Sequence, residues 1–145
     1  MEKIPVAVPT VRATGAGVYT EIISVEAPAS AVAGSLVSVR VTIKNKFSSE
    51  IGIMVGGALE YGVSPWPTIS FPNDWANFPA GVSYYFDGTF TAPYYPPGKE
   101  IIIHAYSYYY GGDGSWHFDD EKTKSISLGA AEAEFQSLSV SYAKV

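Results

Sequence analysis

The strongest constraint on the fold of this chain is a strict alternation of apolar and polar side chains between Ser35 and Lys44. The apolar positions in this segment are Val37, Val39, Val41 and Ile43. A period of two places these side chains on one face of a β-strand, whereas a helix would spread them around its axis. The segment is therefore predicted to be a half-buried strand, whose apolar face needs a second layer to cover it.

Further β-prone runs lie on both sides of this strand and are separated by glycine and proline turns. They cover residues 19–26, 51–55, 82–91, 100–110 and 122–128. Gly56 and Gly57 are expected to end one run, and 111–114 is expected to form a hairpin turn. Apart from a single possible turn at 130–134, no amphipathic helix is found. The pattern predicts an all-β, immunoglobulin-like antiparallel β-sandwich of about seven to nine strands.

The 145 residues divide into three expected parts. Residues 1–17 are broken by Pro5 and Pro9 and predict an extended N-terminal arm. Residues 18–129 form the sandwich. Residues 130–145 form a C-terminal tail with a probable β-strand, because apolar side chains again occur at every second position. The apolar positions of this tail are Leu138, Val140 and Tyr142.

The charge and the distribution of apolar residues exclude some classes of partner. A net charge of −5 disfavours nucleic acid as a partner, because the phosphate backbone is repelled. No run of about 18 apolar residues is present, so no membrane insertion is expected. The N-terminus is interrupted by prolines and lacks the pattern of a signal peptide. The localisation stays open, and the expectation is a virion or export by a non-classical route. No cofactor is expected.

The chain offers few groups for catalysis. It has two histidines and no cysteine, and His104 is expected to pack among aromatic neighbours within a strand. An enzyme would need Asp74, Asp87 and Asp119 to converge, which spacing alone does not indicate. The acidic positions near His117 are weak candidates for a hard cation such as calcium, but their spacing fits no EF-hand. These positions are Asp113, Asp119 and Asp120. A solvated hairpin tip is preferred, so neither a metal site nor an enzyme is predicted.

Aromatic residues are the most informative side chains, since 11 Tyr, 7 Phe and 3 Trp make up 14% of the chain. Roughly half are expected to fill the core, and those in loops are expected to supply contact area. The predicted interface residues in loops are Trp66, Trp75, Tyr94, Tyr95 and Trp116. The arm adds Ile4, Val6, Val8 and Val11, and the tail adds Leu138, Val140 and Tyr142.

A family resemblance rests on two segments. Residues 24–28, read Ser-Val-Glu-Ala-Pro, are followed by the glycine turn at Gly34 and by the alternating strand that ends in Lys44-Asn45. This opening, together with Phe-Thr-Ala-Pro at 90–93, resembles the immunoglobulin-like, adhesion-related (CARDB-like) domains of bacteria, archaea and viruses. The resemblance implies a sandwich that decorates, adheres or assembles in surface proteins, capsids and tails.

Two functions follow as hypotheses. The first is a non-enzymatic structural or assembly protein, such as a virion component in capsid decoration or a tail, which contacts other protein subunits as a homo-oligomer or lattice. Its arm would reach a neighbour and its tail would add to another sheet. The alternative is a carbohydrate-binding or adhesion module, in which loop aromatics stack on sugar rings beside Asn73 and Asp74.

Overall fold

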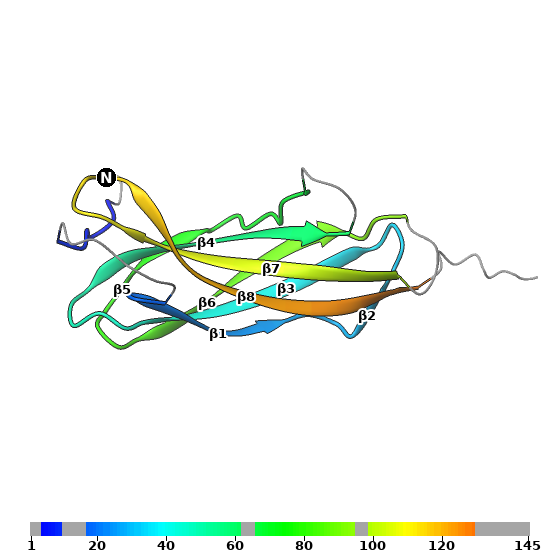
Figure 1. Cartoon of the computed structure of the whole chain (residues 1–145), viewed down its shortest axis with the longest axis horizontal. Helices are drawn as coiled ribbons and strands as arrows, with labels where there is room; N and C mark the ends of the chain where they lie inside the picture. The colour runs from blue at the N-terminus through cyan, green and yellow to red at the C-terminus, as the bar shows by residue number, and fades with distance from the viewer. Residues whose placement is uncertain (1–3, 10–16, 62–65, 95–98, 130–145) are drawn as a thin grey trace, which may run out of the picture.

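The structure, a computed structural model, describes residues 4–9, 17–61, 66–94 and 99–129. Its regular elements are all strands (Figure 1). They are β1 (Thr20–Glu26), β2 (Ser30–Val32), β3 (Leu36–Asn45), β4 (Ile51–Glu60), β5 (Trp75–Phe78), β6 (Ser83–Thr91), β7 (Lys99–Tyr110) and β8 (Trp116–Gly129). The predicted all-β sandwich is confirmed.

The strands form two sheets that pack face to face. One sheet has the order β1-β3-β6, and the other has the order β2-β8-β7-β4-β5. All pairings are antiparallel except that of β2 with β8, which is parallel. The longest ladder joins β7 to β8 through the turn at 111–115, where the amide of Gly111 donates to the carbonyl of Ser115 at 2.8 Å.

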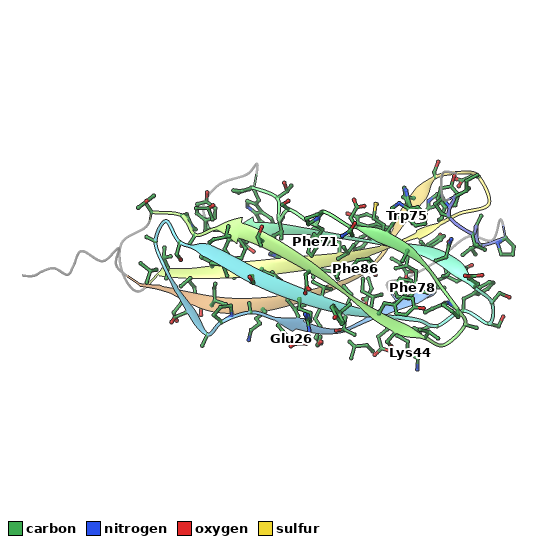
Figure 2. All side chains as sticks on the ribbon, turned by 180° about the vertical axis from the view of Figure 1, so that it is seen from behind. Glu26, Lys44, Phe71, Trp75, Phe78 and Phe86 are labelled. Atoms are coloured by element: carbon green, nitrogen blue, oxygen red, sulfur yellow. The ribbon has the colours of Figure 1, made fainter. Side chains whose placement is uncertain are left out.

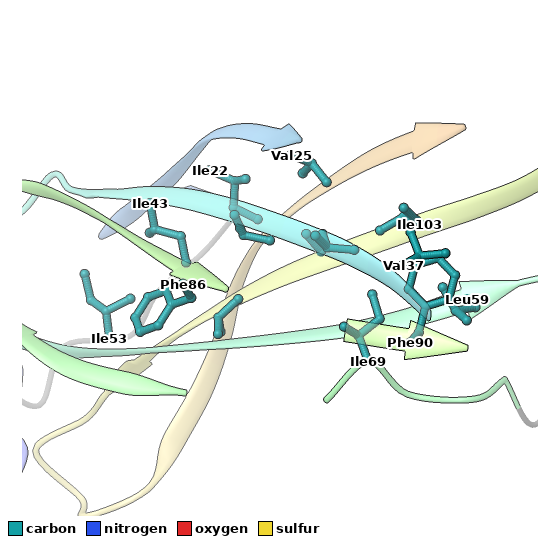
Figure 3. Packing of buried hydrophobic residues seen from close by; sticks show 14 of the residues in the cluster. Ile22, Val25, Val37, Ile43, Ile53, Leu59, Ile69, Phe86, Phe90 and Ile103 are labelled. Atoms are coloured by element: carbon teal, nitrogen blue, oxygen red, sulfur yellow. The ribbon is translucent and has the colours of Figure 1, made fainter. Parts of the chain in front are cut away.

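The core lies between the two sheets and is built from the inward positions of every long strand (Figure 3). On β3, the alternating residues predicted to be buried are all at most 3% exposed. They meet Ile53 of β4 and Ile101 and Ile103 of β7, each fully buried. Burial of these branched side chains supplies the main driving force for the sandwich.

Two details of the strand prediction need correction. Gly56 and Gly57 do not end β4, which runs on to Glu60. Both glycines pair with β7 within the ladder. At Gly57 the side chain of Ile69 occupies the space that a Cβ atom would take, and at Gly56 a Cβ atom would crowd the ring of Tyr108. The short strands β2 and β5 were not predicted, since each has too few residues to show an alternation. The expected C-terminal strand lies outside the described residues.

The first described segment, residues 4–9, packs on its own domain. Val8 is 1% exposed and belongs to the core, and its amide donates to the carbonyl of Tyr110 at 2.7 Å. The amide of Gly52 donates to the carbonyl of Val6 at 2.6 Å. The side chain of Asn77 on β5 bonds both the Val6 amide and the Ile4 carbonyl. This part of the predicted arm therefore caps one end of the sandwich.

The segment 66–74 closes one side of the sandwich by joining both sheets. The amide of Ile69 donates to the carbonyl of Gly57 on β4 at 3.0 Å. The next residue, Ser70, exchanges two hydrogen bonds with Thr89 on β6, at 2.9 and 3.0 Å. Beyond this link, toward the start of β6, the edges of β5 and β6 face each other with a groove between them.

Candidate binding surface

The outer face of the five-stranded sheet carries a set of aromatic side chains. On β7 the inward positions are buried, whereas the residues between them point outward and are partly exposed. The matching outward residues of β8 pair with them, and two tryptophans flank them. We call this set the aromatic surface: Trp66, Trp75, His104, Tyr106, Tyr108, Tyr110, Trp116 and Phe118.

Ring contacts connect the members of the aromatic surface in two groups. At one end, Trp66 stacks on His104 with ring centroids 4.9 Å apart. His104 also stacks with Tyr106, with ring centroids 6.3 Å apart. Phe118 then contacts both Tyr106 and Tyr108 edge to face, at 5.9 and 6.1 Å.

At the other end of the surface, Trp116 contacts Tyr110 at 5.0 Å and Trp75 at 6.2 Å. Phe118 is 52% exposed, so a large apolar ring stands in solvent at the centre of the row. Such rings present apolar contact area at a low cost in conformational entropy.

A carboxylate pair brackets His104. The Nδ1 atom of His104 lies 2.6 Å from Oε2 of Glu121 on β8, and its Nε2 atom lies 2.7 Å from Oε1 of Glu60 on β4. Partial burial opposes protonation of the ring, but the hydrogen bonds to Glu121 and Glu60 outweigh it and raise the pKa of His104 above its usual value. The result is a charged cluster directly beneath Trp66.

A groove of about 340 Å³ lies beside the aromatic row. Its floor is Gly56, Gly57 and Ala58 of β4, and its walls include Tyr106 and Tyr108 on one side and the 68–74 segment on the other. A Cβ atom on Gly56 would come within 3.2 Å of the Tyr108 ring, so the glycine allows that ring to lie flat against the sheet. Burial raises the pKa of Tyr108, which keeps its hydroxyl neutral.

The structure brings together three of the predicted loop aromatics. Trp66, Trp75 and Trp116 all belong to the aromatic surface, although Trp75 lies on β5 and Trp116 begins β8. Tyr94 lies elsewhere: it is 78% exposed, and its hydroxyl occupies the space that a Cβ atom on Gly34 would take. Tyr95 lies outside the described residues.

The apolar candidates at the two termini are dispersed. Ile4 is 73% and Val6 38% exposed at the end of the sandwich, whereas Val8 is buried in the core of its own domain. Of the remaining candidates, Val11 in the arm and the tail residues Leu138, Val140 and Tyr142 lie outside the described residues.

The acidic candidates have separate partners. Asp119 is 1% exposed and accepts hydrogen bonds from the amides of Val18 and Thr20. Asp120 accepts from the amide of Ile22, and Asp113 bonds the exposed ring of His117. In the ranges that the structure describes, no three His, Asp or Glu side chains gather in a way that could hold a metal ion.

Sequence reasoning passed over Tyr106, Tyr108, Tyr110 and Phe118 as site residues. Residues 100–110 are apolar or aromatic at nearly every position, so a period of two is hard to see. The usable signal is that the even positions from His104 to Tyr110 all hold rings, while the odd positions from Ile101 to Ser107 hold aliphatic or small side chains. Tyr109 breaks this pattern, because its ring is at an odd position and is buried.

Comparison with solved structures finds similar sandwiches at low sequence identity. The alkylpurine DNA glycosylase AlkC of Pseudomonas fluorescens aligns with a TM-score of 0.56 and 14% identity over 77% of this chain and 31% of that one. A β-glucosidase of Listeria innocua aligns with a TM-score of 0.53 and 16% identity, over 77% and 16%. This chain therefore spans less than a third of either protein.

The CARDB domain of the PF1109 protein of Pyrococcus furiosus aligns with a TM-score of 0.50 and 12% identity, over 74% of this chain and 90% of that domain. No family model and no curated protein matches the sequence. Among the described residues there is no helix long and apolar enough to cross a membrane. The fold and these likenesses define the chain as an immunoglobulin-like β-sandwich protein.

Proposed function

We propose that this protein is a non-enzymatic interaction module that docks protein partners on the aromatic surface. The observation that carries the proposal is the row of rings on the outer face of the five-stranded sheet, with Phe118 more than half exposed at its centre. Contiguous exposed apolar area is uncommon on isolated domains and is typical of contact sites. Tyr and Trp also dominate the binding energy of protein interfaces.

The geometry around His104 supports a binding role over a catalytic one. A general base needs a ring nitrogen that is open to substrate. Here Glu60 and Glu121 occupy both ring nitrogens at hydrogen-bonding distance, and Trp66 covers the ring. The cluster therefore fixes Trp66 and the sheet surface beneath it.

The sequence also favours a role as a virion component, and that role stays a prediction.

The test uses a random peptide library panned against the full chain. We expect selected peptides to be rich in apolar side chains and to shift the NMR signals of residues 102–110 and 116–123. Phe118→Asp should weaken their binding at least about tenfold, because a charge would be placed in an apolar contact. Ile23→Asp is the matched control, since Ile23 is 43% exposed on β1 of the other sheet. Peptides that bind equally to both variants would contradict the proposal.

Carbohydrate binding is the second candidate, and the glycine-floored groove favours it. The groove is open to solvent beside the Tyr106 and Tyr108 rings, and Asp74 lies in its wall to accept from hydroxyl groups. A glycan array with the wild-type chain and Tyr108→Ala tests this function. A glycan bound by the wild type and lost in the variant supports it, and no bound glycan removes it.

A further inference from the structure

The edge of β6 has unpaired backbone groups over part of its length. In the antiparallel β3-β6 ladder, alternate residues of β6 point their amide and carbonyl groups away from β3. Thr89 is one of these residues, because both of its groups pair with Ser70. Asp87 and Tyr85 have the same orientation, and among the described residues no backbone partner faces them on that side.

A groove of about 660 Å³ runs beside this free edge. It separates β6 from β5, and its lining includes Trp75, Ala76, Tyr84 and Phe86. Figure 2 places Trp75, Phe78 and Phe86 in the same half of the sandwich, and the rings of Phe78 and Phe86 lie 5.9 Å apart. The β6 edge of the groove offers backbone hydrogen bonds, and the side chains that line the groove offer aromatic rings. An added β-strand requires this combination.

The chain carries a segment with the pattern that this groove needs. Residues 137–142 read Ser-Leu-Ser-Val-Ser-Tyr, so every second side chain is apolar and the others are serine. In a strand paired with β6, Leu138, Val140 and Tyr142 would face the groove and the serines would face solvent. Neither proline nor a charge interrupts these residues.

The point where the tail begins, after Gly129, favours a contact between copies. Gly129 is the last residue of β8 and pairs with Val32. This pair lies at the end of the sandwich where β7 begins. The free part of β6 lies toward the opposite end, next to the start of β4 and the end of β5 (Figure 1). A tail at one end and an acceptor at the other suit a head-to-tail contact, which repeats to form rings or filaments.

We propose that residues 137–142 of one copy add as a strand to the Tyr85 to Asp87 edge of β6 in a neighbouring copy. This proposal deepens the interaction role and rests on it, but its groove beside β6 shares only Trp75 with the aromatic surface. The apolar residues of the tail fill the groove beside Trp75 and Tyr84. Backbone hydrogen bonds to Tyr85 and Asp87 set the register.

Full-length variants in light scattering across a range of concentrations test the proposal. Val140→Asp places a charge in the groove and should weaken self-association at least about tenfold. Ser139→Asp is the matched control one residue away on the solvent face, and it should associate like the wild type. Equal behaviour of the two variants would overturn the proposal, and so would a wild-type chain that stays monomeric.

The acceptor edge has its own matched pair. Tyr85→Pro removes the outward amide without removing a hydrogen bond to β3, so an edge proline is tolerated there. Tyr85→Ala removes the same ring, which lies 3.8 Å from the Arg40 guanidinium, but keeps the amide. We expect self-association of Tyr85→Pro to be weaker than that of Tyr85→Ala by about tenfold or more.

Mixing the two defective chains gives the sharpest result. Val140→Asp chains keep a working groove and Tyr85→Pro chains keep a working tail, so the mixture should form one-to-one dimers and nothing larger. Failure to form these dimers would overturn the head-to-tail contact. Peptide binding to the aromatic surface would be unchanged in both variants, so failure here is distinguishable from failure of the proposed function.

Discussion

The carboxylate of Asp119 on β8 accepts hydrogen bonds from both the backbone amide and the hydroxyl of Thr20 at the start of β1, at 2.7 and 2.6 Å. Both residues are at most 1% exposed. The Thr20 hydroxyl also lies 2.6 Å from that of Ser107 on β7. Because β1 and β8 belong to different sheets, this buried network joins the two layers near one end of the sandwich.

Replacing Asp119 with alanine should destabilise the fold by about 2 to 4 kcal/mol, because several buried donors lose their acceptor. Urea unfolding followed by tryptophan fluorescence measures the change. Asp113→Ala is the control, because its carboxylate bonds the exposed ring of His117 and solvent screens that pair, so the variant should be about as stable as the wild type. Equal losses in the two variants would show that the network does not stabilise the fold.

The N-terminal segment should stabilise its own domain. Val8→Ala should cost about 1 to 3 kcal/mol, because it leaves a cavity in the core. Ile4→Ala at the 73% exposed position should change the free energy of unfolding by less than about 0.5 kcal/mol. Thermal unfolding of the two variants tests this difference. A Val8→Ala protein as stable as the wild type would mean that residues 4–9 leave the domain in solution.

Gly57 should be intolerant of a side chain although it lies in a regular strand. A Cβ atom there would lie 2.8 Å from the Ile69 side chain and 3.2 Å from the His104 carbonyl. Gly57→Ala should therefore cost about 1 to 3 kcal/mol through overpacking. Gly129→Ala is the control, because its Cβ would meet only ordinary contacts at 3.7 Å. Denaturant unfolding should separate the two, and equal stability would place Ile69 away from Gly57.

The long strands could be predicted because each one repeats a local rule. The alternation in β3 determines which side chains are buried, whatever the rest of the chain does. The same is not true of the 66–74 segment, whose position depends on pairing with β4 and β6, strands that lie on either side of it in sequence. Its two prolines, Pro67 and Pro72, indicate only an irregular path.

The aromatic surface depends on contacts distant in sequence and was predicted only in part. The tryptophans were selected because they stood in apparent loops, which is correct for Trp66 alone in the described structure. Phe118 was passed over because β8 begins at Trp116, before the alternation of 122–128 becomes visible. Which rings share a face is set by the β7-β8 register, including a register shift after Ser107, and no local pattern encodes that shift.

The cluster of Glu60, His104 and Glu121 makes stability depend on pH in a defined direction. Burial disfavours the charged ring, but the two carboxylates outweigh it and raise the pKa of His104 above 6.5 in the folded state. A raised pKa means that the folded protein holds the proton more tightly than the unfolded chain. The stabilisation is therefore complete below about pH 6.5 and is lost as the pH rises through the folded pKa.

His104→Gln should remove this component of the pH dependence, because glutamine cannot take up a proton. We expect the free energy of unfolding, measured in urea from pH 5 to 8, to fall more steeply with pH in the wild type than in the variant. His117→Gln is the matched control, since its partner Asp113 is exposed and solvent screens the pair. Identical pH profiles for the wild type and His104→Gln would show that the two carboxylates do not stabilise the protonated ring. NMR titration of His104 measures its pKa directly.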